Sequence, residues 1–350
     1  MSKLFYKALG KKDTWPELTF TNPAALTYDD VLLVPQNSAI VSRTTVETNI
    51  KFGPYTLEKP IIAAPMDTVS GDKMIRKLSE LGAIGILPRG KIDERVALCK
   101  TFIKEDIKCV YAVGLKNGLE EAKLLSGNGA KIILVDVAHG GMVTVKNLAQ
   151  EIKKKFGVFV IAGNIVTYEQ AKEYKERGLD YARVGVGPGG LCITRLVAGS
   201  GFSQLSAIFD TTSADIPVIA DGGIKGPGQF AKAIAAGARM AMIGSIFAGT
   251  DEAPGEEIDG YKVARGQASA EYMKDNGVHT GEFRTAEGIS IKVPVKGPVK
   301  DIIDDLMGGL RSAMTYSGAE SIEDFQKKAV FAVVSEAGRE ESKPWLSTFK

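Results

Sequence analysis

A thiol and a hydroxyl stand two residues apart in a glycine-rich segment, and these residue types at this spacing could do covalent chemistry. The segment, residues 184–195, reads Val-Gly-Val-Gly-Pro-Gly-Gly-Leu-Cys-Ile-Thr-Arg and ends an apolar run. Glycine is kept where the main chain turns sharply or approaches a ligand, because it costs backbone entropy elsewhere. The glycines therefore predict exposed amides and carbonyls aimed at a small ligand, which makes Cys192 a candidate nucleophile with Thr194 beside it.

Short apolar runs recur along the chain and alternate with segments of helical periodicity that have charged outer faces. The runs are residues 61–64, 83–86, 110–113, 132–135, 158–161, 181–184, 218–220 and 240–243. Apolar strands that alternate with amphipathic helices predict a parallel sheet covered by helices, and this number of units predicts closure. The expected fold class is α/β, a (β/α)8 TIM barrel.

Polar and glycine residues follow several of these runs, where the chemistry of such a barrel belongs. They include Met66 after the first run, Asp136 to His139 after the fourth and Asn164 after the fifth. His139 could accept a proton or make a rim hydrogen bond. The pairs Gly222-Gly223 and Gly244-Ser245 follow the last two runs, where backbone amides of a barrel commonly hold a phosphate. A phosphorylated ligand is therefore expected.

Asp221 precedes one of these glycine pairs and could accept hydrogen bonds from a sugar diol, which would make the ligand a nucleotide. Two other interpretations are open at this point: Asp221 could cap a helix, or it could pair with another barrel residue. A glycine pair after a strand is also common in ordinary turns.

Composition excludes several classes of function. The chain has 350 residues, of which 44% are hydrophobic and 25% charged, enough for one large core. Its net charge of +2 is dispersed, which disfavours nucleic-acid binding, and no apolar run is long enough to span a membrane. The start of the chain does not resemble a secretory leader, and the cysteine count is odd, so a cytoplasmic location is expected. Cys99 and Cys109 are expected to be buried as small hydrophobes.

Several motifs together resemble the superfamily of inosine-monophosphate dehydrogenase and guanosine-monophosphate reductase. They occupy residues 26–35, 64–69, 163–164, 185–195, 220–224 and 308–312, and the resemblance runs from about residue 26 to about residue 340. It implies a purine nucleoside monophosphate as substrate and attack of Cys192 on C2 of the purine to give a covalent thioimidate. The dehydrogenase then uses NAD and water, whereas the reductase expels ammonia and uses NADPH.

Three features favour the reductase, an enzyme of purine nucleotide salvage. The second strand leads directly to a helix, without the CBS regulatory domains usual in the dehydrogenases, and the chain lacks their Arg-Tyr flap pair. Residues 281–288 also resemble the short flap of the reductase. We therefore expect one barrel domain over residues 1–350, with a catalytic loop at about 185–205 and a flap after strand eight at about 250–297. Residues 336–342, however, resemble the tails of dehydrogenases.

The resemblance also implies a role for each matching residue. Thr194 and Glu287 would relay the proton to the leaving amine, beside the nucleophile Cys192. The expected substrate contacts are Met66, Gly190, Asp221, Gly222, Gly223, Gly244, Ser245, Gln267, Ser269, Arg284 and Gly288. The expected cofactor contacts are Arg89, Asp136, Ala138 and Asn164. The carbonyls of Gly187, Gly189 and Cys192 match a site for a monovalent cation, typically K+, on which dependence varies between the branches. The resemblance further implies a homotetramer.

Three departures from the family pattern bear on binding. Gly190 stands where a serine hydroxyl is usual, Gln267 where a methionine lines the base pocket, and Pro88-Arg89 where His-Lys is usual. Two alternatives therefore stay beside the reductase. One is a dehydrogenase without CBS domains that oxidises the inosine nucleotide with NAD, and the other is a non-catalytic regulator that binds purine nucleotides.

Overall fold

The computed structural model describes residues 25–277, 281 and 285–343, and a parallel eight-stranded sheet forms its centre. In chain order the strands are β4 (Ile61–Ala63), β5 (Gly85–Leu87), β6 (Cys109–Val113), β7 (Ile132–Asp136), β8 (Phe159–Ile165), β9 (Tyr181–Val184), β10 (Val218–Asp221) and β11 (Met240–Ile243). The sheet runs from β5 in order to β11, which pairs with β4. A parallel bridge between Ile62 and Ile84 closes the ring. The predicted (β/α)8 barrel is confirmed.

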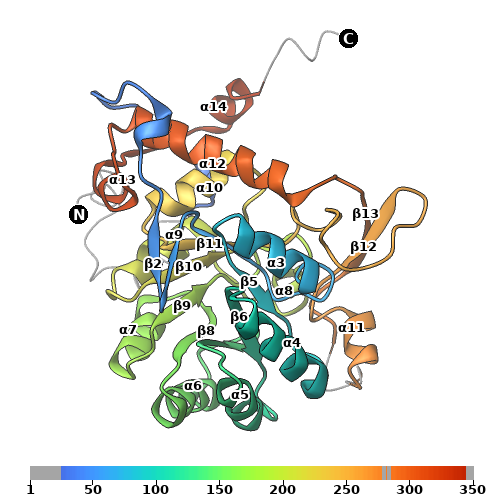
Figure 1. Cartoon of the computed structure of the whole chain (residues 1–350). Coiled ribbons are helices and arrows are strands. Elements are labelled where there is room, and N and C mark those ends of the chain that lie inside the picture. Colours follow the sequence, from blue (N-terminus) through green and yellow to red (C-terminus); the bar gives the residue numbers. More distant parts are fainter. Residues whose placement is uncertain (1–24, 278–280, 282–284, 344–350) are drawn as a thin grey trace.

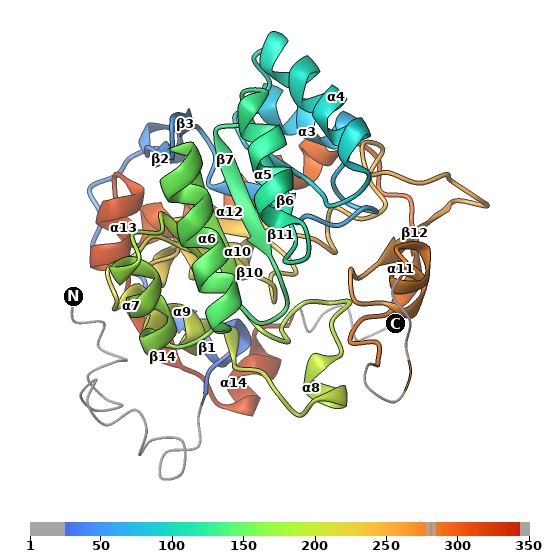
Figure 2. The same ribbon diagram turned by 90° about the horizontal axis from the view of Figure 1, so that it is seen from below.

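Helices follow the strands and cover the barrel (Figures 1 and 2). They are α3 (Asp72–Glu80), α4 (Ile92–Lys104), α5 (Gly118–Gly127), α6 (Val143–Phe156), α7 (Tyr168–Glu176), the short α8 (Thr194–Val197), α9 (Gln204–Thr212) and α10 (Pro227–Ala235). Local signals set their ends. A capping box between Thr167 and Gln170 begins α7, and Gly157, with a left-handed φ of 64°, ends α6.

The barrel strands supply most of the core. Every residue of β6 and of β7 is buried, as apolar runs covered on both faces require. Cys99 and Cys109 are 0% and 1% exposed and free, which confirms the prediction that they act as small buried hydrophobes. The predicted strand positions are also confirmed, with ends that shift by a few residues.

Further helices, helical turns and strands lie outside the eight barrel units. Those before the barrel are the helical turns η2 (Tyr28–Asp30) and η3 (Arg43–Thr45) and the strands β1 (Val31–Leu33), β2 (Ile50–Phe52) and β3 (Tyr55–Leu57). Those near the end of the chain are α12 (Val299–Tyr316), α13 (Ile322–Lys328), β14 (Phe331–Val333) and α14 (Glu336–Glu341). Strand β1 pairs with β14, and β2 pairs with β3. Helix α12 packs along α10 (Figure 1). Within the described residues, no helix is long and apolar enough to cross a membrane.

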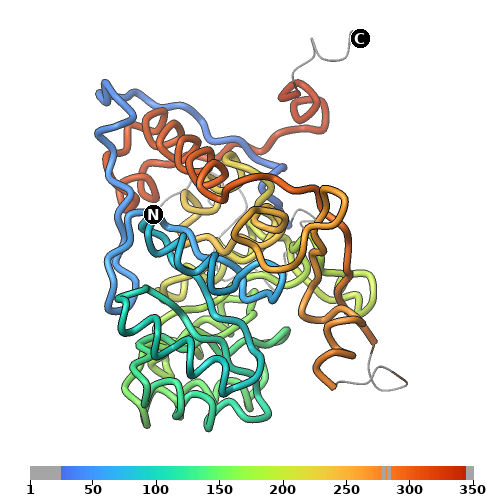
Figure 3. The backbone as a smooth tube through the Cα atoms, turned by 45° about the vertical axis from the view of Figure 1, so that its right-hand side comes forward, coloured from blue at the N-terminus to red at the C-terminus, as the bar shows by residue number. Residues whose placement is uncertain are grey.

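A small substructure follows the last barrel strand. It consists of β12 (Tyr261–Arg265), α11 (Ala270–Asp275) and β13 (Ser290–Pro294), and β12 pairs with β13 in antiparallel register. We call residues 261–294 the insertion. It projects from one side of the barrel and is drawn in orange in Figures 1 and 3. In Figure 2 the short helix α8, which follows the cysteine, lies on the same side.

Candidate active site

A cavity of about 570 Å³ lies at the carboxyl ends of the barrel strands and brings most of the predicted residues together. Cys192, Thr194 and Glu287 line it, and so do Gly187 and Gly189 from the expected cation site. From the expected substrate set, Met66, Gly190, Asp221, Gly222 and Gly223 line it, and so do Gly244, Ser245, Gln267 and Gly288. All four residues of the cofactor set, Arg89, Asp136, Ala138 and Asn164, line it as well. A cavity of this size suits a small ligand such as a nucleotide.

Three polar side chains form a row at the centre of this cavity. The Cys192 thiol lies 3.2 Å from Thr194 Oγ1 and donates to it, and the Thr194 hydroxyl donates to Glu287 Oε2 at 2.8 Å. Cys192 is half-buried, so its sulfur is shielded but reachable from the cavity. The row gives a proton a continuous path between the thiol and the carboxyl group, as general acid–base chemistry requires.

Backbone contacts hold the two halves of this row against each other. Ile193 N donates to the Glu287 carbonyl at 2.8 Å, and Cys192 and Gly288 form an antiparallel bridge. Ala268 then accepts from the amides of both Glu287 and Gly288, at 3.0 and 3.1 Å. The position of Glu287 is therefore set by the cysteine loop on one side and by the start of α11 on the other.

Glycine is sterically required at two places in the rim. Gly185 has a φ of +143°, and a Cβ there would lie 2.1 Å from the carbonyl oxygen of Asp221. Gly222 has a φ of +97°, and its Cβ would lie 2.9 Å from Pro188. Both positions combine a backbone conformation that side chains rarely adopt with close neighbours. They let the cysteine loop pack directly onto the end of β10.

A buried arginine joins two of the predicted carboxylates. Arg183, within β9, donates through Nη1 to Asp136 and through Nε to Asp221 at 2.9 Å. Asn164 Nδ2 donates to the same Asp221 oxygen at 2.7 Å and to the Gly185 carbonyl at 2.6 Å. Burial works against the charge of Arg183, but the two carboxylates outweigh it and raise its pKa. Asp221 thus pairs with barrel residues, one of the predicted alternatives, while it still lines the cavity.

Two of the three departures from the family pattern contact each other beside Asp136. Arg89 Nη2 lies 3.5 Å from Gln267 Oε1, and Arg89 Nε lies 3.2 Å from Asp136 Oδ2. Gln267 Nε2 donates to the Pro65 carbonyl, on the loop after β4. The amide of Gln267 is thereby held with its oxygen toward the arginine.

The third departure lies beside a hydroxyl that can substitute for the missing one. A Cβ at Gly190 would lie 3.3 Å from Ser245 Oγ, so the two residues face each other across a narrow gap. Gly222, Gly223 and Gly244 line the same end of the cavity. Backbone amides and one hydroxyl are therefore available to an anionic group there.

The structure places one predicted substrate residue differently, and another lies outside the described residues. Ser269 is 0% exposed and does not line the cavity, and its hydroxyl accepts from Tyr272 N as the cap of α11. Arg284 lies outside the described residues. Sequence reasoning missed Arg183, although a charged residue inside an otherwise apolar strand was a signal that could have found it.

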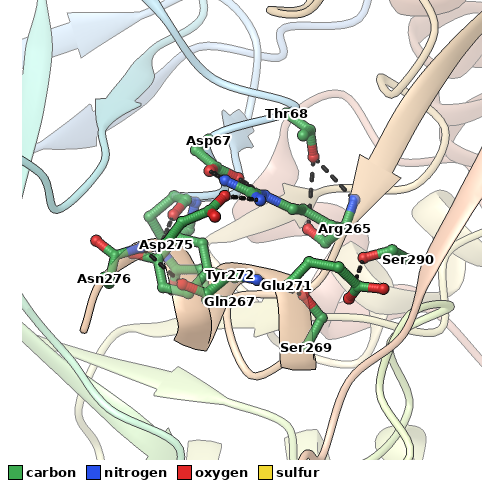
Figure 4. A network of polar contacts seen from close by, with 11 residues as sticks. Asp67, Thr68, Arg265, Gln267, Ser269, Glu271, Tyr272, Asp275, Asn276 and Ser290 are labelled. Carbon is green, nitrogen blue, oxygen red and sulfur yellow. Dashed lines mark hydrogen bonds and ion pairs between the residues drawn. The ribbon is translucent and has the colours of Figure 1, made fainter. Parts of the chain in front are cut away.

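Sequence reasoning also missed a polar network at the base of the insertion (Figure 4). Arg265, the last residue of β12, pairs with Asp67 on the loop after β4 and with Asp275 at the end of α11. The hydrogen bonds that Arg265 donates to Asp67 are the main reason that the pKa of Arg265 lies above its ordinary value. The network joins the insertion to the barrel rim.

Together, the closed barrel and the cavity at the carboxyl ends of its strands define a barrel protein with a small-ligand cavity that Cys192 lines. A sequence model of the family described as "IMP dehydrogenase / GMP reductase domain" matches residues 25–345. The chain belongs to this family of oxidoreductases.

Curated relatives come from both branches of the family. An inosine-5'-monophosphate dehydrogenase of Cryptosporidium parvum is 36% identical over 91% of this chain and 94% of its own length. A GMP reductase of Ligilactobacillus salivarius (strain UCC118) is 38% identical over 84% of this chain and 92% of its own length. A dehydrogenase of Aquifex aeolicus (strain VF5) is 45% identical, but over 64% of this chain and 49% of its own length.

Proposed function

We propose that this chain is a GMP reductase, which converts GMP and NADPH to IMP, ammonia and NADP+. The observation that carries the proposal is the row of Cys192, Thr194 and Glu287, whose last member comes from the insertion. A carboxyl group that reaches the thiol through one hydroxyl suits protonation of a leaving amine. Activation of water in the dehydrogenase branch relies on an Arg-Tyr pair, which this sequence lacks.

In the first half of the reaction, Cys192 Sγ bonds to C2 of guanine and the 2-amino group leaves. The thiol proton passes to Thr194 Oγ1 while the threonine proton passes to Glu287 Oε2, along contacts of 3.2 and 2.8 Å. The same path in reverse delivers a proton to the amine, which departs as ammonia. The product is a thioimidate between Cys192 and C2, and the atoms balance because the thiol hydrogen ends in ammonia.

In the second half, a bound reduced nicotinamide would supply a hydride to C2; cleavage of the carbon–sulfur bond would then give IMP and the Cys192 thiolate, which takes up a proton. We place the cofactor beside Asp136, whose buried Oδ2 forms an ion pair with Arg89 Nε at 3.2 Å but makes no hydrogen bond within the described residues. Leu115 and Met142, each 38% exposed, line the same cavity and could shield a flat ring. Arg89, Asp136, Ala138 and Asn164 are the residues we assign to this subsite.

The remaining residues of the cavity are assigned to the nucleotide. Gly222, Gly223, Gly244 and Ser245, with the amide of Gly190, would hold the phosphate, and Asp221 would accept from the ribose diol. Met66, Gln267 and Gly288 would contact the base. The carbonyls of Gly187, Gly189 and Cys192 supply the hard oxygen donors that K+ prefers, and we assign that ion to them.

The larger organisation belongs to the same proposal. Helix α4 alone lies between β5 and β6, which supports a single barrel domain without CBS modules. We further propose that the enzyme works in the cytoplasm as a homotetramer and that the insertion is part of its flap, at about residues 250–297.

A dehydrogenase that oxidises IMP with NAD is the second candidate. It is favoured by the 36% identity to the Cryptosporidium parvum dehydrogenase over 91% of this chain. Ion-exchange separation of nucleotides separates the two functions. The proposal expects IMP to appear from GMP with NADPH, and it expects Cys192→Ala to abolish that product. Formation of XMP from IMP with NAD, with GMP left untouched, would overturn it.

A further inference from the structure

We propose that Arg265 is a positioning residue. Through its contacts with the loop after β4, it holds the insertion in place, and this keeps Glu287 aligned with Thr194 and Cys192. The inference rests on the proposed function only in treating Glu287 as the proton carrier. Arg265 itself does not line the cavity, so it would act through other residues.

The side chain of Arg265 is the centre of the network in Figure 4. Nη2 lies 2.5 Å from Asp67 Oδ2, and Nε lies 3.1 and 3.3 Å from the two oxygens of the same carboxylate. Nη1 lies 2.6 Å from Asp275 Oδ2, and the guanidinium also lies over the ring of Tyr272, 5.5 Å from its centroid. One planar cation therefore joins the barrel rim to the middle and the end of α11. A lysine has neither the fork nor the reach for all of these contacts.

Hydrogen bonds also hold the main chain of Arg265 in place. Arg265 N donates to Thr68 Oγ1 at 3.0 Å, and the Thr68 hydroxyl lies 3.4 Å from the Arg265 carbonyl. Thr68 directly follows Asp67, so two consecutive residues of one loop hold both the side chain and the backbone of Arg265. The side chain is only 19% exposed, which shields the ion pair from water.

The backbone of residues 266–268 connects Arg265 to the segment that carries Glu287. Gly266 N donates to the Ile289 carbonyl at 3.1 Å, and Ala268 O accepts from the amides of Glu287 and Gly288. A shift of residues 265–268 away from the rim would therefore carry Glu287 away from Thr194. A displacement of about 1 Å in a catalytic group can cost about 100-fold in rate.

The test compares Arg265→Gln with a matched arginine outside the site. Arg239 directly precedes β11, at the amino end of that strand. Its side chain is 25% exposed and pairs with Glu323, and its Nε lies 3.4 Å from the Lys51 carbonyl oxygen. We expect Arg265→Gln to lower kcat by about 10-fold to 100-fold, with the KM of the nucleotide changed much less. We expect Arg265→Lys to recover part of the loss, since it can still pair with Asp67, and Arg239→Gln to leave kcat unchanged.

A second readout does not depend on turnover. Hydrogen exchange of the amides of Glu287 and Gly288 should be faster in Arg265→Gln than in the Arg239→Gln protein, because the segment that carries their acceptor, Ala268 O, loses its side-chain contacts to Asp67 and Asp275. Equal exchange and equal kcat in the two variants would overturn the inference. If the wild-type protein oxidised IMP instead of reducing GMP, the proposed function would fail, but the exchange comparison would still test the role of Arg265.

Discussion

Replacement of Glu287 by glutamine isolates proton transfer from binding. Glutamine keeps the shape of the side chain and an oxygen that can accept from Thr194 Oγ1, now 2.8 Å from Glu287 Oε2, but it cannot carry the proton. The backbone of residue 287 stays fixed by Ala268 and Ile193. General acid–base catalysis is worth roughly 10²–10⁴-fold, so we expect kcat to fall by at least about 100-fold and the KM of GMP to change by less than about threefold.

The assay is the loss of NADPH absorbance under saturating GMP, with Glu271→Gln as the control. Glu271 is also a carboxylate of the insertion, but it is exposed and accepts from Ser290 Oγ at 2.8 Å rather than from the catalytic row. We expect Glu271→Gln to retain wild-type kcat. The reasoning would be refuted if Glu287→Gln kept kcat within about threefold of wild type, or if both variants lost activity equally.

Three further predictions concern the phosphate end, the rim and the outer face. Gly190→Ser should lower the KM of the nucleotide several-fold in steady-state assays, since its hydroxyl would lie near Ser245 Oγ; an unchanged or higher KM would contradict this. Gly185→Ala should lower the free energy of unfolding by about 2–6 kcal/mol in urea titrations, through overpacking and strain at a φ of +143°; a wild-type value would contradict it. The hydrogen bond from Lys146 lowers the pKa of Glu173 from 4.5, so this carboxylate stabilises the fold above pH 4.5 and loses that effect as the pH falls through its lowered pKa. The difference in urea midpoint between wild type and Glu173→Gln should therefore be constant above about pH 5 and shrink at lower pH, and a difference that grew on acidification would contradict the sign.

The barrel could be predicted because its signal is local and repeated. Runs such as residues 132–135 are apolar throughout, and this pattern is what a strand buried on both faces requires. The glycine-rich loop carried its own signal too, since the left-handed conformation of Gly185 leaves few other residues possible. Because most candidate residues follow these apolar runs, they could be assigned from the sequence to the carboxyl-end rim of the barrel.

The contacts that align the site could not be predicted in the same way. Arg265 contacts Asp67, which lies 198 positions away in the sequence. No local sequence pattern around either residue indicates that the two pair. The hydroxyl of Ser269 could serve a ligand or a helix, and only the start of α11 shows that it caps the helix. Pairing between distant polar side chains depends on how the insertion folds back, and local composition does not encode that path.

The most direct measurement is absorbance at 340 nm with purified protein in potassium buffer, run with GMP plus NADPH and separately with IMP plus NAD, with ammonia measured in parallel. We predict that absorbance falls in the first mixture with one ammonia released for each NADPH consumed. A rise in the second mixture alone would contradict the reductase and make the chain a dehydrogenase that activates water without the Arg-Tyr pair. No change in either mixture would contradict both reactions and favour a nucleotide-binding regulator.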